Sequence, residues 1–351
     1  MTRWSAMKGI GVAVAVTLML RAAPVSACGG LVGENGTIQL LKTTTLAAYT
    51  SGVERYVTAF EFSGEGESVG SIVPLPDVPT TVERAGDWTL QRLALEVAPP
   101  APEAAAAATL AAEDAGVEIV LQTEIDALDI TVLKGGGDAV GKWAIDNGFL
   151  LSPDAPEVLD FYAQRSPVFM AAKFDANRAA ALGQGAGDST PIMATIPTDD
   201  PWVPLRILSL GLDADRSVEA DVFLLTDEQP ELLAGGPGLT LARSETASPL
   251  LLDDLRSDVA MEWVPQSMWL SYLQLDASAG DLDYDLAVSA DPSSEPSIDD
   301  AGVGPASVVP ISVADAGPAL WPLVAGIGAA FVAIAALATV RRRTDVSEVS
   351  P

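Results

Sequence analysis

An uncharged apolar run near the C-terminus most constrains what this chain can fold into. Residues 320–340 read LWPLVAGIGAAFVAIAALATV and contain no charged side chain. As an α-helix rising about 1.5 Å per residue, this run is about 31 Å long, close to the roughly 30 Å hydrocarbon core of a bilayer. Trp321 stands at the outer end, where an indole ring prefers to lie. We therefore predict one transmembrane helix over 319–340.

The residues after this run indicate the orientation. Arg341, Arg342 and Arg343 follow directly, and a cationic cluster beside a span is typical of the cytoplasmic side. We predict that the three arginines stop transfer of the chain and begin a cytoplasmic tail over 341–351. Because this tail is too short for a folded domain, we expect the function to reside in the part outside the membrane.

The N-terminus has the three parts of a secretion signal. Two basic residues and no acid precede an apolar stretch over 10–20, and the small residues Val25 and Ala27 follow. This order is typical of a cleaved signal peptide, and the stretch is too short to span a bilayer. We predict a signal over 1–27 and a single-pass protein of the cell membrane, with its N-terminal domain outside. A buried N-terminal helix would leave the cationic start unexplained.

Cys28 is the one cysteine of the chain and would be the first residue after signal cleavage. Small residues before a cysteine are typical of bacterial lipoprotein signals, so Cys28 is a candidate lipidation site. The alternative is an ordinary signal that leaves a free N-terminal cysteine. A single cysteine also excludes an intramolecular disulfide. We therefore expect the outside fold to rest on its hydrophobic core alone.

The composition excludes several classes of function. The 351 residues include no histidine, which excludes Ser-His-Asp and Cys-His nucleophiles, His-ligated zinc and His-bound haem. With 48 acidic and 19 basic residues the formal net charge is −29, which disfavours nucleic acid as a partner. The acidic surface could serve solubility or bind cations, and we favour solubility. We expect no cofactor, and between an enzyme and a non-enzymatic protein we favour the latter.

Hydrophobic alternation predicts a strand-rich α+β extracytoplasmic domain over 28–288 with a few short helices. An Ala/Pro-rich insert over 98–116 interrupts it, and a disordered acidic stalk over 289–318 follows. A turn over 63–68 is expected to join two antiparallel strands. We predict helices over 138–147 and 155–165, a turn-rich stretch over 228–238, and strands over 37–48, 55–62, 69–75, 117–125, 129–133, 168–174, 192–196, 205–210, 218–225, 267–275 and 282–288.

One glycine-rich segment partly fits a phosphate-binding loop. Residues 136–142 read GGDAVGK, but Trp143 stands where Ser or Thr must hold magnesium. A glycine turn leading into a short helix is the favoured interpretation.

A run of alternating acids partly fits a calcium loop. Asp281, Asp283 and Asp285 have the right spacing, but Leu286 and Pro292 replace the Gly and Glu that such a loop needs. We favour a strand with one solvated face, and we expect the acid pairs at 253–254 and 299–300 to be solvated.

Two further constellations leave alternatives open. A pair of carboxylates could hydrolyse a glycosidic bond without histidine, if the two acids face each other across a cleft. Tryptophans could form a sugar-binding platform, although core packing is their commoner use. The tryptophans in question are Trp88, Trp143, Trp202, Trp263 and Trp269.

Several segments in order resemble a bacterial envelope family known as domain of unknown function 2330. They are Ala27–Gly30, Val73–Pro76 with Pro79, Lys142–Phe149, Tyr162, Phe169–Lys173 and Pro204–Arg206. The resemblance covers about 28–226, with a gap over the insert. Many relatives have a second cysteine soon after the first, and its absence here removes any metal or disulfide role for such a pair. The resemblance implies no reaction, cofactor or site residue.

We therefore predict an envelope protein whose outside domain binds or scaffolds something without catalysis, with no ligand identified. The alternatives are a carboxylate-based hydrolase of envelope glycans and a cation-dependent adhesion module.

Overall fold

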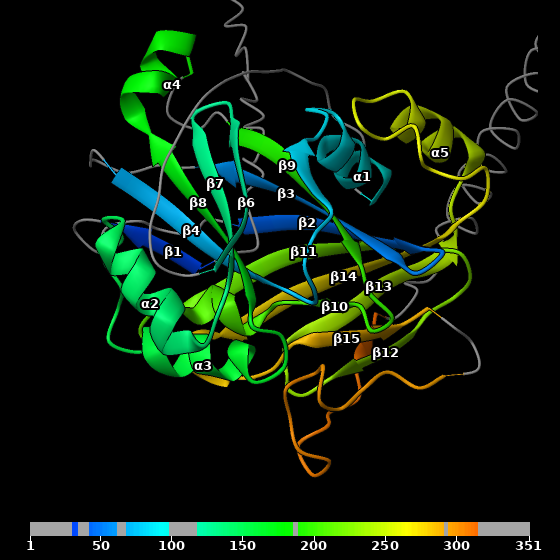
Figure 1. The fold of residues 1–351 in the computed structure, drawn as a ribbon. Coiled ribbons are helices and arrows are strands. Elements are labelled where there is room, and N and C mark those ends of the chain that lie inside the picture. The colour runs from blue at the N-terminus through cyan, green and yellow to red at the C-terminus, as the bar shows by residue number, and fades with distance from the viewer. Residues whose placement is uncertain are drawn as a thin grey trace, which may run out of the picture. The chain divides into compact units, whose positions relative to one another are not determined.

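The computed structural model describes residues 30–33, 42–61, 68–97, 118–184, 189–290 and 294–314 (Figure 1). The chain divides into two compact units, Met1–Ser312 and Val313–Pro351, and of the second only Val313 and Ala314 are described. The expected signal peptide, Cys28, the insert over 98–116, the membrane helix and the arginine cluster all lie outside the described residues. Within the described residues, no helix is long and apolar enough to cross a bilayer.

The described strands form three sheets, which confirms the expected strand-rich α+β class. The largest sheet has the order β16-β13-β14-β11-β2-β3-β9-β5. Its strands are β2 (Lys42–Thr50), β3 (Val53–Glu61), β5 (Thr81–Arg84), β9 (Ser189–Pro197), β11 (Ser217–Thr226), β13 (Leu239–Thr246), β14 (Trp269–Ser278) and β16 (Ser312–Val313).

The two smaller sheets and the helices complete the first unit. The five-stranded sheet, in the order β1-β4-β8-β7-β6, contains β1 (Gly30–Gly33), β4 (Ser68–Leu75), β6 (Glu118–Ile125), β7 (Leu128–Lys134) and β8 (Val168–Asp175). The three-stranded sheet, in the order β10-β15-β12, contains β10 (Trp202–Val203), β12 (Glu231–Ala234) and β15 (Leu286–Ser289). The helices are α1 (Thr89–Val97), α2 (Gly137–Asp146), α3 (Ala155–Ala163), α4 (Ala176–Leu182) and α5 (Pro249–Arg256), with 3-10 turns η1 (Arg206–Ser209) and η2 (Ala279–Asp281).

The large sheet is covered on both faces, which gives the unit two hydrophobic clusters. Successive side chains of a strand point to opposite faces, so Leu46 and Ala48 of β2 join one cluster while Ala47 joins the other. The first cluster lies under α1 and α5, which are neighbours over one face of the sheet (Figure 1). The second, larger cluster joins the opposite face to the two smaller sheets, α2 and α3.

Local sequence explains where the predicted helices begin and end. The glycines that suggested a phosphate loop lead instead into α2, which starts after Gly136. Gly148, expected to end this helix, has φ +84°, a value that costs glycine little. Pro156 lies in the first turn of α3, where a missing N–H is tolerated.

Most predicted strands are confirmed within two or three residues, but the pairing of two of them is not the expected hairpin. β3 pairs with β2 and β9 in the large sheet, whereas β4 pairs with β1 and β8 in the five-stranded sheet. The chain therefore changes sheet between these two strands. Alternation along each strand could not reveal this, because both strands are buried on both faces.

Three other expectations are corrected. The predicted strand over 205–210 is the 3-10 turn η1, because backbone N–H groups at its start turn toward Asp285. The turn-rich stretch over 228–238 contains β12. Of the strand predicted over 282–288, only the last three residues are extended, as part of β15, and Asp285 is buried rather than solvated.

The acidic segment after β15 also differs from the expected disordered stalk where it is described. Ala301 is fully buried, and its carbonyl accepts a hydrogen bond of 2.9 Å from the Asp285 backbone N–H. Val309 forms an antiparallel bridge with Ala234 of β12. Residues 294–312 therefore belong to the folded unit, because small residues at 301 and 302 allow the chain to pack closely against α3.

Candidate functional site

A buried polar centre joins α3, η1 and β15. Oδ1 of Asp285 accepts hydrogen bonds from the Tyr162 hydroxyl at 2.9 Å and from the Leu205 backbone N–H at 2.6 Å. The Arg206 backbone N–H donates to the same oxygen at 3.0 Å, and Arg165 forms an ion pair with Oδ2. Both oxygens of the Asp285 carboxylate are therefore fully engaged.

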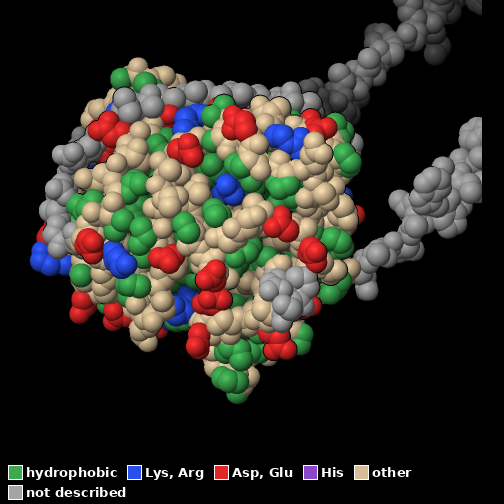
Figure 2. Space-filling view, turned by 45° about the vertical axis from the view of Figure 1, so that its right-hand side comes forward, with side chains coloured by type: hydrophobic (Ala, Val, Ile, Leu, Met, Phe, Trp, Pro, Cys, Tyr) green, Lys and Arg blue, Asp and Glu red, His purple; other side chains and the backbone are tan. Residues whose placement is uncertain are grey.

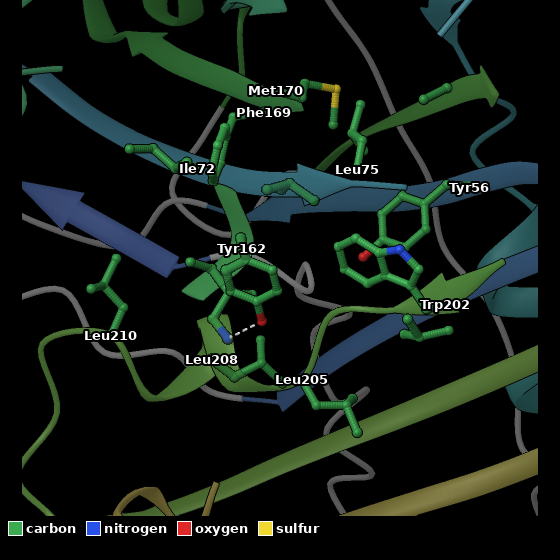
Figure 3. Packing of buried hydrophobic residues seen from close by; sticks show 14 of the residues in the cluster. Tyr56, Ile72, Leu75, Tyr162, Phe169, Met170, Trp202, Leu205, Leu208 and Leu210 are labelled. Carbon is green, nitrogen blue, oxygen red and sulfur yellow. Dashed lines mark hydrogen bonds between the residues drawn. The ribbon is translucent and has the colours of Figure 1, made fainter. Parts of the chain in front are cut away.

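Aromatic rings enclose the basic partner of this centre. The Arg165 guanidinium carbon lies 4.5 Å from the ring centre of Phe161 and 4.7 Å from that of Trp202. Such contacts stabilise a guanidinium that has lost much of its water. The Tyr162 ring stacks on Trp202 at 5.7 Å between centres, and its hydroxyl accepts from the Ile207 N–H at 2.8 Å, the dashed line of Figure 3.

The polar centre is suited to holding the fold together rather than to catalysis. Burial, together with the negative charge of Asp285, raises the pKa of the Tyr162 hydroxyl well above its usual value. The fully buried Asp285 carboxylate accepts from four donors, and the Tyr162 hydroxyl donates its proton to it, so both groups are engaged within the fold. Two segments of the family resemblance, Tyr162 and Pro204–Arg206, thus meet at a structural centre.

A second buried carboxylate, Glu54 of β3, has no such partners. It is fully buried, and neither of its carboxyl oxygens has a hydrogen-bond partner. Burial alone raises the pKa of Glu54 to about 8. Glu54 lines a cavity of about 10 Å³ between the large sheet and the three-stranded sheet. The other lining residues are Ala47, Tyr49, Pro201, Trp202, Val203, Leu224, Thr226 and Val288.

A larger, open groove of about 960 Å³ runs between β12 and the segment over 294–305. Its apolar lining includes Leu232, Leu233, Ile298 and Val303, and its acidic lining consists of Glu231, Glu295 and Asp299. No aromatic or basic side chain is among the described residues that line it.

β12 forms one wall of this groove and is an edge strand. It ends the order of the three-stranded sheet, and beyond it the described chain forms an isolated bridge at Ala234. Glu231, Leu232 and Leu233 pair with β15 and line the groove, while the Ala234 carbonyl accepts a hydrogen bond from the Val309 N–H. An edge strand of this kind is able to pair with a further extended chain.

The residues that motivated a hydrolase do not come together. Among the described lining residues, the groove has acids but no aromatic ring, whereas the cavity has aromatic rings but a single carboxylate. Within the described residues, no three acidic or cysteine side chains gather as a metal site. The described lining of the groove and of the cavity therefore does not combine two facing acids with aromatic walls, as a glycosidase would.

The tryptophans do not form a platform either. Trp143 and Trp202 are buried and contact Phe149 and Tyr162, respectively. Trp263 lies on the other side of the large sheet, where the Arg55 guanidinium carbon is 4.4 Å from its ring centre. Core packing, the commoner use of tryptophan, explains the positions of Trp143 and Trp202, whereas Trp88, Trp263 and Trp269 are half-buried.

Of the two acid pairs expected to be solvated, the pair at 253–254 forms ion pairs with arginines, whereas at 299–300 the backbone carbonyls accept from Arg165. Asp253 pairs with Arg256, and Asp254 pairs with Arg92 of α1. Figure 2 shows acidic side chains dispersed among hydrophobic and basic ones on one face, rather than gathered in a single patch.

Sequence patterns missed Glu54 and the groove for different reasons. Glu54 has the same parity along β3 as Tyr56 and Thr58, both buried, and this parity is the signal that could have identified it as an inward-facing acid. The groove has no local signal, because its walls come from segments about sixty residues apart in sequence.

Comparisons with known proteins give one family and weak likenesses to solved structures, including two of baculovirus P35. A family described as uncharacterised protein conserved in bacteria (DUF2330) matches residues 22–229. No curated protein sequence matches the chain. The crystal structure of baculovirus P35 is 8% identical with a TM-score of 0.36, covering 74% of this chain and 96% of that one.

A mutated baculovirus P35 after caspase cleavage is likewise 8% identical, with a TM-score of 0.33, and the match covers 70% of this chain and 95% of that one. TM-scores this low do not indicate a shared fold.

Proposed function

The chain belongs to the DUF2330 family of uncharacterised bacterial proteins, and we propose that it is a single-pass envelope protein that binds a partner without catalysing a reaction. The envelope placement rests on the sequence, through the signal-like N-terminus, the apolar run over 320–340 and Arg341–Arg343. The partner class rests on the groove beside β12.

The occupant that the groove fits best is an extended, basic polypeptide segment. The outer side of β12 offers backbone groups for a further strand, and Leu232 and Leu233 offer apolar contacts for its side chains. Glu231, Glu295 and Asp299 supply negative charge, and none of the described lining residues is basic. This charge favours Lys and Arg in the bound segment and disfavours acidic ones.

Fluorescence anisotropy with the full-length protein in detergent tests this binding. The probe is a nine-residue labelled peptide of alternating Lys and Val. We expect saturable binding that weakens by about tenfold or more when Glu231→Lys and Glu295→Lys are combined, because like charges then face each other. Methylation of alternate peptide N–H groups should also abolish binding, since strand addition requires those donors.

The matched control combines Glu83→Lys with Glu219→Lys. Both acids are exposed and lie on strands of the large sheet that do not line the groove. Because this variant also replaces two Glu by two Lys, it changes the net charge as much as the groove variant does. If both double variants weaken binding equally, the peptide binds by net charge alone and the groove is not its site.

The candidate lipid anchor at Cys28 is tested separately. We propose that the mature chain begins at this residue, with or without an attached lipid. Mass spectrometry of the purified mature N-terminus distinguishes the two, because an unmodified Cys28 excludes a lipoprotein.

A further inference from the structure

The three-stranded sheet contributes a wall both to the Glu54 cavity and to the groove beside β12. Val288 of β15 lines the cavity, and Leu232 of β12, its direct partner in the sheet, lines the groove. Leu232 also packs against the buried cluster that contains Val288 and Trp202. A displacement of this small sheet at the cavity would therefore also change the wall of the groove.

The strands of this sheet are short. β10 has two residues, and β12 and β15 have four each, whereas β11 and β14 of the large sheet have ten each. Outside the sheet, the Val288 N–H donates to the Pro201 carbonyl at 3.1 Å, and the Val309 N–H donates to the Ala234 carbonyl at 3.3 Å. Of the two walls of the cavity, the three-stranded sheet is therefore the easier to displace.

Glu54 lies on the other wall, in surroundings that do not stabilise a charge. Its partners in the large sheet are Tyr49 of β2 and Ile196 of β9, and the Tyr49 hydroxyl donates to the Thr198 carbonyl at 3.0 Å. Trp202 of β10 carries an indole N–H, but neither carboxyl oxygen of Glu54 has a hydrogen-bond partner. The carboxyl group is fully buried without a donor.

The charged groups that act beside Glu54 are acidic. Burial raises the pKa of the Tyr49 hydroxyl, and so do the charges of Asp199, Asp200, Glu54 and Asp227. The other residues of the lining are uncharged; they are Ala47, Pro201, Trp202, Val203, Leu224, Thr226 and Val288. An ionised Glu54 therefore has no counter-charge among the described residues that line the cavity.

The small volume of the cavity links ionisation to a movement of its walls. A buried carboxylate needs water or other donors, and it can accept several hydrogen bonds. The volume of about 10 Å³ is near the minimum for a single water molecule. Hydration of the charge therefore requires the cavity to widen. Burial raises the pKa of Glu54 to about 8, so widening is expected above about pH 8 and not at neutral pH.

We propose that ionisation of Glu54 loosens the three-stranded sheet and so lowers the affinity of the groove for its peptide. The groove then binds an extended basic segment while Glu54 is protonated and releases it as Glu54 loses its proton. The linkage is reciprocal, so a bound peptide also favours the protonated carboxyl group. The loosening follows from the cavity, whereas the release step rests on the proposed function.

Hydrogen exchange of the full-length protein in detergent tests the loosening without any peptide. The wild-type protein and Glu54→Gln are compared at the same pH, so the pH dependence of the chemical exchange rate cancels. At pH 9 we expect the amides of β12 and β15 to exchange about fivefold or more faster in the wild-type protein, and at pH 7 we expect equal rates. The amides of β7, in the five-stranded sheet, should exchange equally in both proteins at either pH.

Two further variants make the comparison specific. Glu54→Met cannot ionise and suits an apolar lining, so it should behave as Glu54→Gln does and replaces that variant if the amide does not fold. Glu219→Gln removes an exposed acid from β11 of the same large sheet, so it should behave as the wild-type protein does.

Fluorescence anisotropy with the Lys-Val peptide at pH 7 and pH 9 tests the release step. Between these values the affinity of the wild-type protein should fall by about fivefold or more relative to that of Glu54→Gln. Any loss of charge on the peptide itself affects both proteins equally, so the comparison isolates the effect of Glu54.

Three results have distinct meanings. Equal exchange of β12 and β15 in the wild-type protein and Glu54→Gln at pH 9 would overturn the proposal, and so would an equal acceleration in β7, which would indicate general destabilisation. Parallel changes of peptide affinity in the two proteins would overturn the release step. Absence of peptide binding at both pH values would instead contradict the proposed function, and the exchange rates would still decide whether Glu54 loosens the sheet.

Discussion

Two buried carboxylates show how differently the same chemical group is used within one fold. Asp285 is surrounded by donors and carries its charge beside Arg165. Glu54 has no donor, so its charged form is costly at neutral pH. Asp285 therefore forms a structural centre, whereas burial favours the protonated form of Glu54.

Removing Asp285 should be among the most damaging single changes. Asp285→Ala leaves Arg165 buried without its counter-charge and leaves three donors without an acceptor. We expect the free energy of unfolding to fall by about 3–5 kcal/mol in urea denaturation. Asp283→Ala, at an exposed acid of the same sequence motif, should change it by less than about 0.5 kcal/mol. Similar losses at both positions would contradict a special role for Asp285.

Glu54 should make stability fall as pH rises. Its pKa of about 8 in the folded protein lies above the ordinary value of 4.5, so the folded state holds the proton where the unfolded state has released it. The contribution is therefore complete below about pH 4.5 and is lost progressively up to about pH 8, at up to about 1.4 kcal/mol per pH unit.

Urea denaturation of the wild-type protein and of Glu54→Gln at a series of pH values measures this contribution. Glu54→Gln should gain stability relative to the wild-type protein as pH rises from 5 to 8. Parallel profiles for the two proteins would mean that Glu54 titrates normally in the fold.

At the level of elements, α1 and α5 depend on each other. They lie over one face of the large sheet, and Arg92 of α1 pairs with Asp254 of α5. Ser248 begins α5 by accepting a hydrogen bond of 3.1 Å from the Leu251 N–H, and its hydroxyl also contacts Glu96 of α1 at 3.1 Å. The Ser248 hydroxyl therefore caps α5 and also links it to a side chain of α1.

Ser248→Ala should lower the free energy of unfolding by about 1 kcal/mol, since Leu251 loses its cap. Ser257→Ala, at the exposed C-terminal end of the same helix, should have a smaller effect. Chemical denaturation followed by circular dichroism compares the two. A greater loss at Ser257 would argue against capping as the cause.

At the level of the whole molecule, the folded unit extends beyond the part that the family matches. The match ends at residue 229, yet β14 pairs with β11 along its whole length and Asp285 completes the polar centre. The domain predicted to end at 288 likewise continues through 294–312, because Ala301 and Val309 pack or pair with it.

Truncated chains test how far the folded unit extends beyond the matched region. A chain over 28–314 should unfold in one cooperative transition. A chain over 28–229 should not, because it lacks the strand that covers one side of β11 and lacks Asp285. Circular dichroism during urea titration distinguishes them. A cooperative transition in the shorter chain would show that the matched region folds alone.

The sequence by itself determined the fold class and many of the elements of this protein. Period-two alternation predicted β3, β4, β8 and β11, and glycine and proline placed the ends of α2 and α3, because these signals depend on near neighbours. The segments that resemble the DUF2330 family, taken in their order along the chain, also predicted the family correctly. The membrane helix and the lipid on Cys28 remain predictions.

Only the tertiary structure decided which strands pair and where polar side chains meet. Glu54 became a buried, unpartnered acid through its neighbours on β2 and β11, and Asp285 found its donors 79 to 123 residues away in sequence. The groove arose from β12 and a segment expected to be disordered. Local sequence patterns depend on the neighbours of a residue along the chain. The burial and the ion pairs of a side chain depend instead on residues that are distant in sequence and that the fold places in contact with it.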